Sequence, residues 1–64
     1  MKTISKYLLK DKANFSLGVE CQDENGNTCS IDDEQVQYVN VQYDNCIDEY
    51  SKTGEDEFTL ISVN

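Results

Sequence analysis

A chain of 64 residues can enclose only one small hydrophobic core, and no other property restricts its fold as strongly. A domain of this size buries about 60% of the surface that its unfolded chain exposes. An enclosed substrate cavity would remove side chains that such a core needs. We therefore expect a single domain over residues 1–64, with its functional site on an exposed surface.

Several residue types are missing, and each absence argues against a chemistry. The chain contains no His, Arg, Trp or Pro. Without His it lacks the usual general base near neutral pH and the commonest metal ligand, and without Arg it lacks the planar group that binds phosphates bidentately. Its cysteines form no CxxC motif and fit neither a disulfide framework nor a zinc site. We expect no enzyme activity, no cofactor, no metal and no direct binding of nucleic acid.

Charge is distributed unevenly along the chain, whose net charge at pH 7 is −8. Residues 1–12 carry four lysines and Asp11, which sum to +3, whereas residues 13–64 carry twelve carboxylates and Lys52, which sum to −11. A field of one sign over most of a surface steers partners of the opposite charge. The alternative is that the acidity serves solubility alone. We favour a basic partner, because charges this dense repel one another and oppose folding.

Apolar residues alternate with polar or small ones over residues 15–22, which is typical of a half-buried strand. A turn and a second short strand follow. A three-residue loop over residues 24–26 would pair Cys21 with Cys29 and place Gly26 in the left-handed conformation that such loops require. A two-residue turn would mix the apolar and polar faces, so we favour the first register. We expect free thiols at Cys21 and Cys29; the alternative is a strained bridge between them.

A main amphipathic helix is predicted between Ser30 and Gly54. Acidic residues follow Ser30, as in a first helical turn, and Gly54 suits the position after a last turn. Apolar residues between them recur at three- and four-residue steps and would form one stripe: Val36, Val39, Tyr43, Cys46, Ile47 and Tyr50. The alternative is a strand over residues 36–43, because Val and Tyr favour strands. We favour the helix because that run alternates poorly.

Residues 58–63 predict a closing strand, and residues 1–12 fit either a short amphipathic helix or an edge strand. The predicted fold is therefore α+β, a small antiparallel sheet of three to four strands with one main amphipathic helix packed on one face. The first apolar run is too short for a signal peptide, and no segment approaches the length of a membrane span. We expect a cytoplasmic protein that is a monomer or a weak dimer and does not bind membranes.

The acidic residues form clusters in the predicted hairpin, at the helix start, on the helix body and before the last strand. Carboxylates one turn apart on a helix stand about 5–6 Å from each other, a separation of the same order as that between phosphates along a nucleic-acid strand. Tyr38, off the helix stripe, would add an aromatic anchor. The predicted partner-binding residues are Asp23, Glu24, Asp32, Asp33, Glu34, Asp44, Asp48, Glu49, Glu55, Asp56 and Glu57.

In its size, charge pattern and α+β type, the chain resembles the small acidic inhibitors of bacteriophages and mobile elements, in particular anti-CRISPR proteins and other DNA mimics. The resemblance implies a stoichiometric inhibitor that docks on the Lys/Arg-lined DNA-binding surface of a CRISPR effector and excludes target DNA. A multi-subunit type I effector (Cascade) is favoured over a single-protein one. The alternative is a small acidic protein–protein interaction module, antitoxin-like or an accessory subunit, which contacts its partner through tyrosines and apolar groups.

Overall fold

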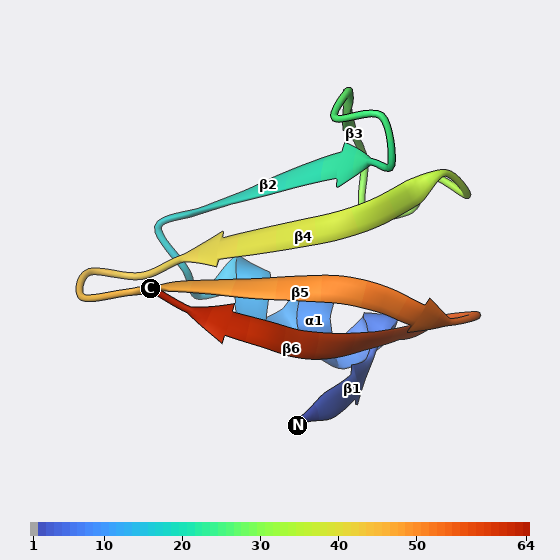
Figure 1. The fold of residues 1–64 in the computed structure, drawn as a ribbon. Helices are drawn as coiled ribbons and strands as arrows, with labels where there is room; N and C mark the ends of the chain where they lie inside the picture. The colour runs from blue at the N-terminus through green and yellow to red at the C-terminus, as the bar shows by residue number, and fades with distance from the viewer. Residues whose placement is uncertain (1) are drawn as a thin grey trace.

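The computed structural model describes residues 2–64, which form a six-stranded antiparallel sheet with a single helix against one face (Figure 1). The strand order across the sheet is β1-β6-β5-β4-β2-β3. In chain order the elements are β1 (Thr3–Ser5), α1 (Lys6–Asn14), β2 (Gly18–Asp23), β3 (Thr28–Cys29), β4 (Val36–Gln42), β5 (Ile47–Gly54) and β6 (Glu57–Val63).

The predicted main helix between Ser30 and Gly54 is wrong, and so is the prediction of only three to four strands. Most of that segment forms the hairpin of β4 and β5, in which Val39 pairs with Tyr50 and Val41 with Asp48. The strand considered as an alternative over residues 36–43 corresponds to β4. Val36 is buried but out of step with Val39, because the pairing of β4 with β2 shifts register near Gln22 and Asp23. This irregularity breaks the alternation and produces the helix-like spacing.

The only helix among residues 2–64 is α1, which has nine residues. The start of the chain therefore adopts both forms considered for it, a short edge strand followed by a helix. The Ser5 side chain caps the helix by accepting a hydrogen bond from the Leu8 backbone N–H at 3.2 Å. Leu9 is the one fully buried residue of this helix and anchors it to the core.

The hydrophobic core lies between α1 and the face of the sheet that α1 covers. Its buried side chains are Ile4, Leu9, Cys21, Val36, Val39, Val41, Tyr50 and Phe58. No described element covers the other face (Figure 1), which carries polar and aromatic residues such as Tyr38 and Asn40 together with the exposed aliphatic residues Ile47 and Ile61. An antiparallel sheet commonly has one packed and one solvated face, so this open face is available for contacts.

The predicted hairpin register is confirmed. Cys21 pairs with Cys29, and Gly26 has a φ of 85°. Asp23 donates its backbone N–H to the Asn27 carbonyl at 2.9 Å and so closes the loop. All three cysteines are free thiols. The predicted first strand begins later than expected, at Gly18, and the predicted closing strand corresponds to β6.

Candidate functional site

Three acidic segments that are separated in sequence meet at one end of the sheet. Because neighbouring strands are antiparallel, β2 and β5 end at the same end of the sheet at which β4 and β6 begin. The β2–β3 turn, the β3–β4 loop and the β5–β6 turn therefore lie at the same end of the sheet, which runs from the top to the lower right of Figure 1. We call this region the acidic end, and its carboxylates are Asp23, Glu24, Asp32, Asp33, Glu34, Glu55, Asp56 and Glu57.

Two lysines of α1 partly neutralise the acidic end. Lys10 Nζ donates to both carboxylate oxygens of Asp32, at 3.1 and 3.0 Å. Lys6 Nζ lies 3.6 Å from Asp32 Oδ1 and 3.4 Å from Asp56 Oδ1. The hydrogen bond from Lys10 lowers the pKa of Asp32, and the hydrogen bond to Asp56 raises the pKa of Lys6. Asp32 and Asp56 therefore join the helix to two turns and are less available to a partner.

Two further aspartates shape the turns that carry them. Asp23 Oδ1 accepts the backbone N–H groups of Asn25 and Asn27, both at 2.9 Å. Asp33 Oδ1 accepts the backbone N–H of Gln35 at 2.8 Å. Such local hydrogen bonds are typical of aspartate in turns. These carboxylates hold the backbone of the acidic end in place while their charge remains near the surface.

The glutamates of the acidic end are its free charges. Glu24, Glu34, Glu55 and Glu57 are all exposed. Within residues 2–64, none of these side chains forms an ion pair or a side-chain hydrogen bond. Each of the three segments contributes at least one of them, so the end of the sheet presents carboxylates fixed by separate turns.

The other three predicted partner-binding residues do not join the acidic end. Asp44 lies in the turn between β4 and β5, at the opposite end of those strands, and Asp48 and Glu49 lie in the first half of β5. The predicted helical row through Asp44 and Asp48 does not exist, because both residues lie in a hairpin. Tyr38, the predicted aromatic anchor, is on the open face and 39% exposed. It pairs with Gln22, the residue before Asp23, and therefore lies beside the acidic end.

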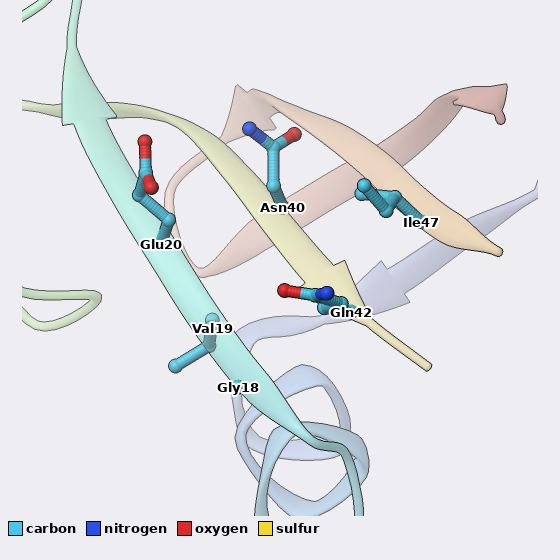
Figure 2. Close-up of a pocket in the computed structure, with 6 residues that line it drawn as sticks. All are labelled: Gly18, Val19, Glu20, Asn40, Gln42 and Ile47. Carbon is cyan, nitrogen blue, oxygen red and sulfur yellow. The ribbon is translucent and has the colours of Figure 1, made fainter. Parts of the chain in front are cut away.

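The open face also carries a shallow hollow of about 250 Å³ between β2, β4 and the start of β5. Figure 2 shows the side chains of Glu20, Asn40 and Ile47 in a row across three neighbouring strands, with Gln42 below Asn40 on the same strand. Asn40 Oδ1 is buried and makes no hydrogen bond within the described chain. The hollow offers amide groups and a single carboxylate, which suits hydrogen bonding to a partner side chain.

Sequence reasoning missed a set of exposed apolar side chains on and just after α1. Phe15 is 89% exposed, Leu17 67% and Leu8 57%. Phe15 lies between two hollows, one bordered by Leu8 and the other by Leu17 and Tyr43. The spacing of Leu8 and Phe15, seven residues apart, would have been a signal for them once the helix had been placed on residues 6–14.

Within residues 2–64, no group of three or more Cys, Asp or Glu side chains is arranged to hold a metal ion. The described part of the chain also contains no helix that is long and apolar enough to cross a membrane. Comparisons with protein-family models, with curated proteins and with solved structures gave no match for this chain.

Proposed function

We propose that the protein is a stoichiometric inhibitor that occupies a basic, nucleic-acid-binding surface of another protein by presenting the acidic end in place of a polyanion. The observation that supports this is the meeting of three acidic segments at one end of the sheet. Their free glutamates are held on turns whose backbones are fixed by hydrogen bonds. Charges of complementary sign across an interface steer the encounter of two partners and disfavour wrong ones.

The repulsion within the acidic end also supports a binding role. Carboxylates gathered at one place oppose folding, and only Asp32 and Asp56 are paired with lysines within the described chain. A partner rich in Lys and Arg would relieve this repulsion on binding. The resemblance to anti-CRISPR proteins suggests a CRISPR effector, with a type I effector as the first to test. Asp44, Asp48 and Glu49 lie away from the acidic end, and we leave them out of the proposed contact.

The proposal is tested with two variants that change the net charge equally. In the first, Glu24→Lys, Glu34→Lys and Glu55→Lys are combined, one from each acidic segment. In the control, Glu20→Lys, Asp44→Lys and Glu49→Lys are combined, all outside the acidic end. The wild-type protein and the control should prevent a purified type I effector from binding its target DNA in a mobility-shift assay, whereas the first variant should not. Equal inhibition by both variants would contradict a role for the acidic end.

A second candidate function is an interaction module that binds through apolar groups. It is favoured by the hollow of about 290 Å³ that Leu17, Tyr43 and Cys46 border with Phe15. A partner bound there would be insensitive to salt, because burial of apolar surface is not screened by ions. Truncation of Leu17 and Tyr43 would then weaken binding more than reversal of charge at the acidic end.

A further inference from the structure

A row of three polar side chains crosses the middle of the open face. Asn40 of β4 pairs with Glu20 of β2 on one side and with Glu49 of β5 on the other. Residues directly opposite each other in an antiparallel sheet share a face, and their Cβ atoms are about 4.5–5.5 Å apart. Two carboxylates therefore flank the Asn40 amide, and Figure 2 shows the amide beside Glu20.

The carboxylates of this row have no counter-ion within residues 2–64. Every ion pair there joins a lysine of α1 to Asp32 or Asp56. Three of the five lysines are in α1, Lys2 borders a hollow beside that helix, and Lys52 pairs with Phe58 of the core. The open face of the described chain therefore carries carboxylates and no lysine, and a cation complements its charge.

The row also borders a hollow that contains an unused hydrogen-bond acceptor. Asn40 Oδ1 is buried and makes no hydrogen bond within the described chain, and the hollow beside it measures about 250 Å³. The Asn40 amide turns easily about its last side-chain torsion, so this oxygen can face a ligand in the hollow. Gln22 Nε2 donates to Glu20 Oε1 at 3.2 Å and positions that carboxylate. The site thus offers acceptors to a ligand that donates hydrogen bonds.

An aromatic ring stands next to the row. Tyr38 is two residues before Asn40 on β4, so its side chain is on the same face, and it is exposed. Because Tyr38 pairs with Gln22 and Ser51, the two glutamates of the row are its diagonal neighbours, about 7–8 Å away and within reach of long side chains. The face of an aromatic ring attracts a cation within about 6 Å of its centre. A cation held by the carboxylates can therefore also contact this ring.

We infer that the site formed by Glu20, Tyr38, Asn40 and Glu49 binds the guanidinium group of an arginine on a partner protein. A guanidinium donates N–H groups in several directions of one plane, so it can bond carboxylates on two sides while its flat face stacks on the ring. A lysine ammonium is a strongly hydrated point charge without such a face. The site lies on the strands, whereas the acidic end consists of turns, so the inference does not depend on the proposed function.

The test is an NMR titration of the isotope-labelled full chain with two blocked tripeptides, which carry one arginine or one lysine between glycines. The side-chain amide of Asn40 gives a signal at the site itself. The arginine peptide should shift this signal saturably, with a Kd on the order of millimolar, because the contacts of one exposed side chain are weak. It should bind at least about twofold more tightly than the lysine peptide. Tyr38→Leu should remove this preference, and Tyr38→Phe, which keeps a ring, should retain it.

Two variants with the same change in net charge separate the site from general attraction to an acidic protein. Glu20→Gln combined with Glu49→Gln should abolish the saturable shift, whereas Glu24→Gln combined with Glu34→Gln should leave it unchanged. The spectrum of each variant verifies that it is folded. An Asn40 signal that does not respond to the arginine peptide, or that responds equally to both peptides, would overturn the inference. So would an equal loss of the shift in both charge variants, whereas the proposed function is tested separately by inhibition of the effector.

Discussion

The Lys10 ammonium donates hydrogen bonds to both carboxylate oxygens of Asp32, at 3.1 and 3.0 Å, and so joins the exposed side of α1 to the β3–β4 loop. Lys10 is four residues after Lys6, so both lysines reach the same carboxylate from one face of the helix. The pairing positions the loop that carries Asp33 and Glu34. Asp32 therefore supports the acidic end instead of contributing a free charge.

This pairing predicts how Asp32→Asn alters the dependence of stability on pH. The pKa of Asp32 is lowered in the folded protein, so its stabilising effect is complete above the unfolded-state value of about 3.9. It is lost as the pH falls below this value through the folded-state pKa. We expect wild type to melt at a higher temperature than Asp32→Asn at pH 7, and the two to melt together well below pH 3.9. Thermal unfolding measured by circular dichroism across this pH range checks the prediction. A difference in melting temperature that persisted in acid would contradict the pairing.

Because the buried Tyr50 hydroxyl has no partner among residues 2–64, we predict that its removal does not destabilise the core. Tyr50 is 1% exposed, and its hydroxyl makes no hydrogen bond to the described residues. A buried polar group without a partner costs about 1–3 kcal/mol. Tyr50→Phe keeps the ring and should raise the free energy of unfolding by about 1 kcal/mol, whereas Tyr50→Ala should lower it by about 3–5 kcal/mol. Urea denaturation of both variants measures this, and a marked loss in Tyr50→Phe would mean that the hydroxyl is bonded.

The positive φ of Gly26 predicts that a side chain at this position strains the backbone without causing a steric clash. Its φ of 85° is unfavourable for residues with a Cβ, yet no atom lies within 4 Å of the position that a Cβ would take. Gly26→Ala should therefore destabilise the protein by about 1 kcal/mol through conformational strain alone. Gly18→Ala is the matched control, because Gly18 is also surrounded by open space but has no positive φ. Equal melting temperatures for the two variants would argue against the predicted strain.

The burial of Cys21 predicts that its thiol is alkylated slowly at neutral pH. Burial raises the pKa of the Cys21 thiol to about 11, so almost none of it is the reactive thiolate at neutral pH. In a C29S/C46S variant, the reaction of Cys21 with iodoacetamide should be very slow at pH 7.5 and should accelerate about tenfold per pH unit toward pH 10. Mass spectrometry measures the rate, and unfolding in urea provides the fully reactive control. Rapid modification of the folded variant at pH 7.5 would contradict the burial of Cys21.

The sequence predicted the local hairpin well because its register depends on neighbouring residues. The three-residue loop with Gly26 and the pairing of Cys21 with Cys29 both follow from turn geometry and alternation. The closing strand β6 was predicted for the same reason. These elements need no knowledge of distant contacts.

The main helix was predicted wrongly because one irregularity in β4 changed the apparent period. Val36 is in the core but out of alternation with Val39, and the turn before Ile47 adds further three- and four-residue steps. The alternation of Val39, Val41 and Tyr43 with polar residues was present and favoured a strand. The three- and four-residue spacing of the apolar residues outweighed this alternation. That spacing arises from a strand, a turn and a second strand, and not from one helix.

The composition of the candidate site was predicted, but its arrangement was not. The acidic residues of all three segments were identified from the sequence. Their meeting depends on the strand order, which pairs β4 with β2 and with β5, and no local pattern contains that information. The same order explains why Asp44, Asp48 and Glu49 lie elsewhere, although they are as acidic as the rest.

The most direct test of the proposed function is competition between this protein and DNA for the same partner. The immobilised protein is loaded with its effector at low salt, and release is measured as duplex DNA is added. We predict that DNA displaces the effector, that added salt weakens the complex steeply, and that the combined Glu24, Glu34 and Glu55 variant captures none of it. A complex that resists both DNA and salt, and forms equally well with that variant, would contradict the proposal that the acidic end replaces a polyanion.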